Sequence, residues 1–473
     1  MTTYSQVAIT SKSIRSKTTK VVHGFVRDAI FNLAKTKKNS AHALDDDMLG
    51  IHWERATDGH FRHRKKRLWS LWHILTKDWF VSQPDFEICA DHLKSDELIG
   101  PHLDHLVGTQ IGTSLIDVNR ILIYLMHAMV DDEGRLKFTD ERFADKWQEL
   151  IDFFGADKIC CTMIAPLPQL VISNFPLRLN DDLVLDHFTD EEVTRCHQAG
   201  VIQPPFGQPS VIDSEVAVGI RKTTYLPKLI RTGEEEYKLP NEGDEGRFGN
   251  RPLFREDLVV DDVLSALQLL KQTWIRPLGH VTCTDYPWIA GFMRSVIIPP
   301  RWYQGSLELS EPELPQFIDI WRHLEKYAAN FGFSIRRFNF SFGRGYLADR
   351  IVDLVIAAEA LFLGDLDDKY RGELRFRFAL RAAKFILHPQ YDEHEVFEVM
   401  RRAYDARNAI VHGGSPKDTR LPDNPSADLR VFIDAVEELV RLGLHKALLM
   451  ADGGKRIRQA VYWDKLMFAQ KPA

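Results

Sequence analysis

The chain has 473 residues, of which 44% are hydrophobic and 27% charged, and its formal net charge is -6 at pH 7. This length exceeds what one hydrophobic core usually serves, so we expect two or three domains. The composition excludes a disordered chain. The small negative charge excludes a general attraction to nucleic acid, so any contact with RNA or DNA must be local.

The cysteines and the apolar segments indicate the compartment. Five cysteines are present, an odd number, and none forms a CxxC pair. This pattern favours a reducing cytosol and argues against a zinc finger. No apolar run approaches the roughly 18 residues that span a bilayer, and the first residues lack the apolar segment of a secretory signal. We therefore expect a cytoplasmic protein without membrane contact.

The first part of the chain divides into a basic arm and a helical region. Residues 1–40 contain eight lysines and arginines against one acid, which predicts a solvated arm with a short helical segment at Val21–Leu33. Residues 41–155 are predicted to be mostly helical. The clearest amphipathic patterns there are Leu115–Met129 and Asp140–Phe154.

Residues 156–330 predict a mixed α+β domain with a sensing or regulatory role. A Thr189-x-x-Glu192 capping box predicts a helix from Thr189 to Ala199, and Val260–Thr273 is a second helical segment. The polar stretch Thr232–Asn250 predicts a surface loop. Short β-prone runs occur at Ile159–Ala165, Leu170–Asn174, Leu183–Leu185, Glu215–Thr223 and Phe292–Ile298.

Residues 334–452 predict a four-helix bundle, so the fold class is an α+β multidomain chain that ends in an all-α bundle. Phe342–Tyr346 is predicted to be a turn before the first of these helices, and residues 453–473 are predicted to be a tail. The predicted helices have one apolar face each and short connections. They comprise a first helix around Ile351–Phe362, then Leu374–Leu387, Val396–Val411 and Leu429–Met450.

The end of the third predicted helix carries the main candidate site. Arg407, Asn408 and His412 supply a fixed cation, an amide and a titratable imidazole, which suffice for cleaving a phosphodiester without a metal. On an ideal helix Arg407 and His412 point about 140° apart, so either the helix loosens near Gly413 or two chains share a site. Alternatively, His412 only stabilises the helix C-terminus as a cation.

Further charged residues of the bundle are candidates for binding or support. Glu359 lies in an apolar context where a carboxylate needs a cationic partner, and Arg381 is the expected one. Loss of one member of such a buried pair would cost about 3 to 5 kcal/mol. Arg375, Arg381 and Lys384 make the second helix cationic and are candidate substrate contacts.

Two groups of histidines and one basic run are weaker candidates. Neither the group His52, His60 and His63 nor the pair His102 and His105 has the HExxH spacing of a zinc protease, so no metal site is expected. The basic run Arg62–Arg67 precedes Trp69 and Trp72, a combination typical of nucleic-acid contacts and equally of an amphipathic helix start.

The bundle resembles the Apea-like branch of the HEPN superfamily. The resemblance is carried by DRIVDLVIAAEALFLGD from Asp349, by ELRFRFALRAAKFIL, and by YDARNAIVHGG, which contains the hallmark Arg-x4-His as Arg407 and His412 with Asn408 after the arginine. It covers roughly residues 334–450. The segment Pro166–Asp190 also resembles the amino-terminal region that accompanies this branch.

The resemblance implies a HEPN-type, metal-independent endoribonuclease that needs no cofactor, binds RNA and forms a homodimer or higher oligomer. In such an enzyme His412 would move the proton, Arg407 would hold the phosphate and Asn408 would orient both. Membership would further imply antiphage defence by abortive infection, with the amino-terminal region responding to a phage-derived or cellular trigger. The alternatives are a HEPN-fold module that binds RNA or a partner without cutting, and an adaptor whose α+β domain does the recognition.

Overall fold

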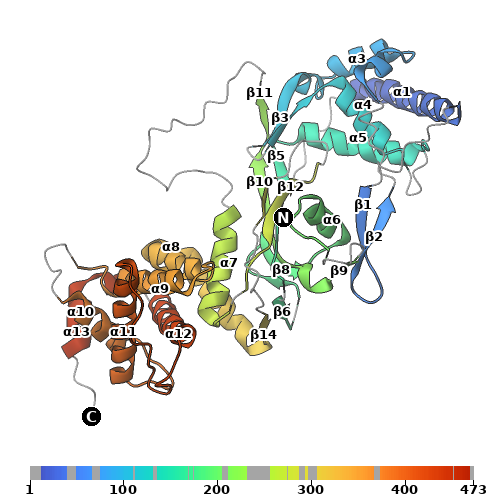
Figure 1. Cartoon of the computed structure of the whole chain (residues 1–473). Coiled ribbons are helices and arrows are strands. Elements are labelled where there is room, and N and C mark those ends of the chain that lie inside the picture. Colours follow the sequence, from blue (N-terminus) through green and yellow to red (C-terminus); the bar gives the residue numbers. More distant parts are fainter. Residues whose placement is uncertain are drawn as a thin grey trace. The chain divides into compact units, whose positions relative to one another are not determined.

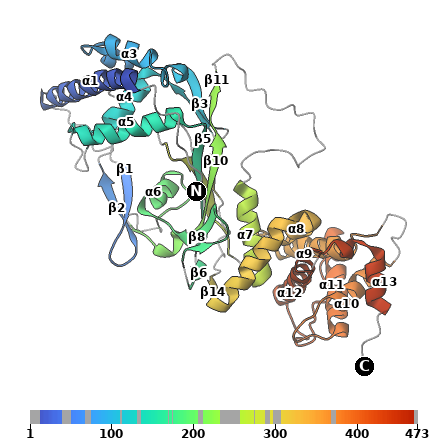
Figure 2. The ribbon, with the colours of Figure 1, turned by 180° about the vertical axis from the view of Figure 1, so that it is seen from behind.

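The computed structural model divides the chain into two compact units. The α+β unit comprises residues 1–166, 182–254 and 279–297, and the helical unit comprises residues 167–181, 255–278 and 298–473. Figure 1 and the reverse view in Figure 2 label their elements. The structure describes residues 12–39, 50–66, 75–109, 112–130, 136–168, 170–173, 175–204, 211–231, 256–273, 275–286, 293–296, 306–366, 373–450 and 452–468.

The α+β unit contains three antiparallel sheets. The main sheet has the order β13-β12-β5-β10-β8 within this unit, and the smaller sheets have the orders β1-β2-β9 and β11-β3-β4. In the main sheet Thr162 of β5 lies opposite Thr223 of β10 and Cys283 of β12. The strands are β1 (Gly50–Arg55), β2 (Phe61–Lys66), β3 (His105–Thr109), β4 (Gly112–Ile116), β5 (Lys158–Pro166), β8 (Leu183–His187), β9 (Val211–Ile212), β10 (Val218–Pro227), β11 (Leu229–Arg231), β12 (Gly279–Thr284) and β13 (Met293–Val296).

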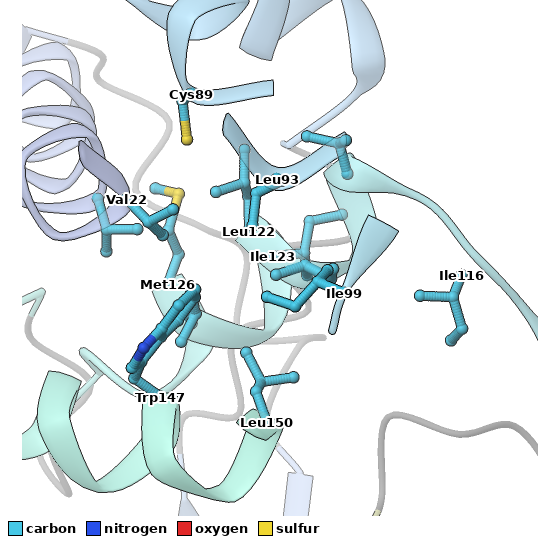
Figure 3. Close-up of a cluster of buried hydrophobic side chains, with 14 of the residues drawn as sticks. Val22, Cys89, Leu93, Ile99, Ile116, Leu122, Ile123, Met126, Trp147 and Leu150 are labelled. Atoms are coloured by element: carbon cyan, nitrogen blue, oxygen red, sulfur yellow. The ribbon is translucent and has the colours of Figure 1, made fainter. Parts of the chain in front are cut away.

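The first five helices of this unit share an apolar core. Figure 3 shows part of it, where Val22 of the first helix meets Cys89, Met126 and Trp147 from three later helices. Burial of such side chains stabilises a fold by about 25 cal/mol per Å² of apolar surface. The helices are α1 (Lys12–Asn39), α2 (Lys77–Val81), α3 (Phe86–Lys94), α4 (Val118–His127), α5 (Asp140–Gly155) and α6 (Asp190–Gln198).

Two sequence predictions for the first 155 residues are wrong. The basic arm is largely helix α1, whose apolar face is buried at Val22, Phe25, Val26, Ile30 and Leu33. These residues recur at three- and four-residue steps, and that amphipathic spacing outweighs the surplus of lysines. The region 41–155 is also less helical than predicted, because β1 pairs with β2 and β3 with β4 as antiparallel hairpins.

The predicted elements of the middle region are largely confirmed. Strands β5, β8 and β13 lie where short β-prone runs predicted them, and Glu215–Thr223 corresponds to a short 3-10 turn followed by β10. Helix α6 begins with the predicted capping box, in which Thr189 and Glu192 bond to each other's backbone N–H groups. The predicted loop Thr232–Asn250 lies outside the described residues.

The helical unit joins the carboxy-terminal helices to earlier segments of the chain. Strand β14 (Leu307–Leu309) pairs in parallel with β6 (Leu170–Ile172), and β7 (Leu177–Arg178) lies in the same segment as β6. The helices are α7 (Glu256–Leu270), α8 (Leu314–Ser341), α9 (Leu347–Phe362), α10 (Leu374–Phe385), α11 (Glu393–Val411), α12 (Leu429–Leu448) and α13 (Ala460–Phe468). Among the described helices, none combines the length and the apolar composition that a membrane crossing needs.

The predicted domain boundaries need correction at both ends of the bundle. Helix α8 runs through the predicted break at residues 330–334, so a fragment that begins there would cut a helix. Helix α7, predicted as part of the α+β domain, belongs to the helical unit, where Arg441 of α12 donates hydrogen bonds to the carbonyl oxygens of Leu269 and Leu270. The predicted tail contains α13, whose Trp463 is fully buried.

Helix α9 is held by buried charged contacts to two neighbours, α12 and α8. Arg350 is buried and contacts Glu437 and Asp434 of α12, with 2.9 Å to the Asp434 carboxylate. Asp353 is 3% exposed and accepts a hydrogen bond of 2.9 Å from Arg337 of α8. These buried ion pairs form only when the helices have one relative position, so they fix how α9 packs against α8 and α12.

We expect Arg350→Met to destabilise the helical unit by about 3–5 kcal/mol, because Glu437 is left as a fully buried, unpaired carboxylate. The double change Arg350→Met and Glu437→Leu should restore most of that stability. Hydrogen exchange of the α9 and α12 amides measures the opening free energy of this unit directly. Arg430→Met, at an exposed arginine of α12, is the matched control. An equal loss in the single and double variants would contradict the assignment.

Candidate functional site

The candidate site lies at the carboxy-terminal end of α11. The helix begins with a capping box, in which Asp392 and Glu395 bond to each other's backbone N–H groups, and its apolar side includes the buried Val396, Met400 and Ala403. It ends in a Schellman turn, because the N–H of Gly414 bonds to the carbonyl of Ala409 at 2.7 Å and that of Gly413 to Ile410 at 2.9 Å.

The Schellman turn requires a left-handed residue directly after His412. Gly413 supplies it with a φ of 78°, a conformation that a side chain would strain. His412 is the C-cap with φ of -92° and ψ of 16°, so the regular helix ends at the histidine. The predicted helix end at Val411 and the stop at Gly413 and Gly414 are confirmed.

Arg407 is held in a half-buried position from two sides. Its Nη1 donates a hydrogen bond of 2.9 Å to Oδ1 of Asn408, and its Nη2 lies 3.5 Å from Oε2 of Glu359 on α9. The side chain is 27% exposed. Its Nε is buried and has no hydrogen-bond partner within the described part of the chain. The guanidinium is therefore oriented, and the exposed part of the side chain remains accessible to a ligand.

Glu359 has a different partner from the expected one. Arg381 instead donates to Asp365 at 2.5 Å and to the carbonyl oxygen of Phe362 at 2.7 Å. Burial raises the pKa of the Glu359 carboxyl, and the nearby charge of Arg407 partly opposes this. With 22% of its side chain exposed, Glu359 is less enclosed than the sequence suggests.

Tyr404 joins this cluster, although the sequence analysis does not name it. The pKa of its hydroxyl is raised first by burial and then by the charge of Glu359. Its ring packs against Phe378 of α10 with 5.5 Å between centroids. The sequence could have indicated Tyr404 by its spacing, because it lies four residues before Asn408 and residues four apart on a helix lie on the same side. Tyr404, Asn408, Arg407 and Glu359 form what we call the Arg407 cluster.

His412 stands apart from the Arg407 cluster. It is exposed, and within the described ranges its ring has no hydrogen-bond or ion-pair partner. A cationic imidazole at a helix C-terminus would gain about 0.3–1 kcal/mol from the helix dipole. Its exposure leaves it equally accessible to a substrate. The structure thus brings together Arg407, Asn408 and Glu359, and leaves His412 free at the next helical turn.

The three candidate substrate contacts on α10 differ in accessibility. Arg381 is 4% exposed, and its guanidinium also lies 4.9 Å from the Trp463 ring, so it supports the fold and does not face a ligand. Arg375 is 48% exposed and pairs with Asp405 of α11. Lys384 is 32% exposed and lies 2.7 Å from Glu393. Only Arg375 and Lys384 can therefore meet a substrate.

The histidine groups have separate surroundings. In the group nearest the N-terminus, His52 lies 3.4 Å from the Thr194 hydroxyl and His60 lies 3.5 Å from Asp213. His63 packs against Trp53. Each ring of the second pair contacts a nearby backbone carbonyl oxygen, His102 that of Leu98 and His105 that of Leu103. Where the structure describes the chain, no group of three potential metal ligands forms.

The basic run after residue 61 lies on a strand and does not begin a helix. Strand β2 contains Arg62, which donates a hydrogen bond of 2.6 Å to Asp58. Trp69 and Trp72 lie outside the described residues.

Comparisons with protein-family models, curated proteins and solved structures give no match to this chain.

We expect Glu359→Gln to leave the chain at least as stable as the wild type at pH 7, within about 1 kcal/mol, because the pair is loose and partly exposed. This differs from the large loss that the sequence suggests. Because the pKa of Glu359 is higher in the folded state than in the unfolded state, protonation stabilises the wild type at a pH below the unfolded-state pKa, and this stabilisation is lost as pH rises through the folded-state pKa. The stability of the variant relative to the wild type should therefore rise between these two pKa values. Denaturant titrations at pH 4 and pH 7 measure the difference, and a loss of several kcal/mol at pH 7 would contradict it.

Proposed function

We propose that the chain is a metal-independent endoribonuclease of the HEPN type, related to the Apea-like branch. The observation that carries the proposal is that one helix end presents the oriented, half-buried guanidinium of Arg407 and, one turn further on, the exposed imidazole of His412. The contacts from Asn408 and Glu359 fix the arginine, while about a quarter of its side chain stays exposed. The chemistry of these groups suits phosphodiester cleavage.

In the proposed reaction the ribose 2'-oxygen attacks phosphorus, and the bond to the 5'-oxygen breaks. A neutral His412 takes the proton from the 2'-hydroxyl, and a protonated His412 gives one to the leaving 5'-oxygen. The products are a 2',3'-cyclic phosphate and a 5'-hydroxyl. Arg407 binds the phosphate oxygens as negative charge grows on them, and Asn408 keeps the guanidinium of Arg407 in position.

A site shared between two chains fits this chemistry. A single His412 cannot be base and acid at the same moment, whereas two copies around a two-fold axis can supply one of each. The exposure of His412 leaves it available to a second copy. We therefore propose a homodimer or higher oligomer that brings both copies of Arg407 and His412 to one RNA.

We further propose that the α+β unit restrains or directs the nuclease in antiphage defence, with a phage-derived or cellular trigger. Such a unit need shift the equilibrium between restrained and active states by only a few kcal/mol. The interleaved chain segments of the two units support this role, because the chain crosses repeatedly from one unit to the other.

We expect Arg407→Ala and His412→Ala each to lower RNA cleavage by about 10²–10⁴-fold, because each removes a group that acts in the transition state. Cleavage of RNA in the presence of EDTA measures this, with thermal melts to verify folding. His394→Ala is the matched control, since His394 is also an exposed histidine of α11 but lies in its first turn. If both variants fold and cut RNA at the wild-type rate, Arg407 and His412 are not the catalytic residues. A wild-type chain that binds RNA and does not cut it would favour the binding-module alternative.

A mixture of wild type with His412→Ala tests whether one site draws on two chains. If the site needs His412 from both chains, mixed dimers are inactive, so equal mixing with subunit exchange should lower the rate per wild-type chain to about half, because about half of the wild-type chains end in mixed dimers. Light scattering before and after mixing verifies the dimer. An unchanged rate per wild-type chain would show that each site belongs to one chain.

A further inference from the structure

Helix α8 exposes aromatic rings and arginines together on one side. Phe333 is 47% exposed and Phe340 is 48% exposed, and Tyr346, in the turn that follows the helix, is 76% exposed. Phe333, Arg337 and Phe340 are spaced four and three residues apart, which puts them in one narrow arc of the helix. With Arg336 and Arg344 these residues form what we call the aromatic-arginine face.

The rings and guanidiniums of this face are close to each other. The Arg337 guanidinium lies over the Phe333 ring at 5.5 Å from its centroid. Arg337 and Arg344 both bond to the buried Asp353, at 2.9 and 2.5 Å. One carboxylate therefore holds two guanidiniums at the surface, and their side chains remain 34% and 41% exposed.

The charge of the face is locally positive, although the chain as a whole is acidic. Three arginines stand against the buried Asp353 and the exposed Asp349 of the first turn of α9. Arg336 is exposed. A protein with net charge -6 can attract a polyanion only through such a local surface.

The apolar part of the face is suited to stacking. Between residues 333 and 346 the large exposed apolar side chains are all aromatic, and the aliphatic Ile335 is buried. Seven residues of helix place Phe333 and Phe340 about 10 Å apart along the axis, so one base cannot cover both rings. Separate bases can stack on the two rings while the arginines contact the phosphates between them.

We propose that the aromatic-arginine face binds single-stranded RNA and so delivers substrate to the helical unit. The choice of RNA as the ligand rests on the proposed function. The inference goes beyond that function because the face lies on α8 and not on α11. Aromatic rings alternating with arginines provide sequence-tolerant stacking with a cationic path for the backbone, which is how non-specific single-strand binders work.

The test measures affinity for fluorescein-labelled oligouridine by fluorescence anisotropy in EDTA, using the full chain with His412→Ala to prevent cleavage. Phe333→Ala and Phe340→Ala should each weaken binding by roughly 5- to 100-fold, whereas Phe340→Trp should retain it. Arg336→Ala should weaken binding and lower the slope of log affinity against log salt by about 0.7. Phe468→Ala, at an aromatic ring of α13 that is 82% exposed, is the matched control and should change nothing.

Light scattering of the same variants tests whether the face instead binds a second copy of the chain. A fall in oligomeric state, with or without a change in affinity, would mean that the face joins two copies of the chain and would overturn the proposal. Unchanged affinity in the folded phenylalanine and arginine variants would also overturn it. If the parent chain with intact His412 cuts RNA while these variants bind normally, only this inference fails. If that chain binds RNA through the face but never cuts it, the proposed nuclease function fails and this inference stands.

Discussion

Helix α9 is the element on which the helical unit depends, because three of its charged residues each meet a different neighbour. Arg350 contacts α12, Asp353 contacts α8, and Glu359 contacts α11. Of these, Arg350 and Asp353 are buried, and a buried charge that loses its partner costs about 3–5 kcal/mol, whereas the Glu359 contact is partly exposed and weaker. The close approach of α12 at Gly443, where a Cβ would come within 3.1 Å of Phe362, fixes the same helix sterically.

This arrangement links the stability of the unit to the position of Arg407. The contact from Glu359 comes from α9, so a guanidinium on α11 is oriented by a helix whose own register is fixed on α12. Tyr404 and Asn408 add orientation from within α11. A site built in this way keeps its geometry without a metal, because rigid helices and hydrogen bonds hold the groups.

The two arginine-rich helices, α10 and α8, differ in the acidic residues that the fold places beside their arginines. On α10, Arg381 is buried against Asp365 and Trp463, and the exposed Arg375 has its own acidic partner, Asp405. On α8, the single buried carboxylate of Asp353 orients two arginines without neutralising both. Local charge therefore follows from which acids the fold places nearby, and not from the number of arginines on a helix.

The sequence by itself determined the local elements with a strong period: α5, α6, α9, α11 and α12, the capping boxes, and the glycine stop after His412. These depend on interactions within a few residues. Only the tertiary structure decided that α1 packs into a core, that α7 and α13 join the helical unit, and that Arg407, not Arg381, meets Glu359. The reason is that partners of buried groups come from segments far apart in the chain. A carboxylate in an apolar helix reveals that it needs a cation, but several arginines can supply one, and only packing selects among them.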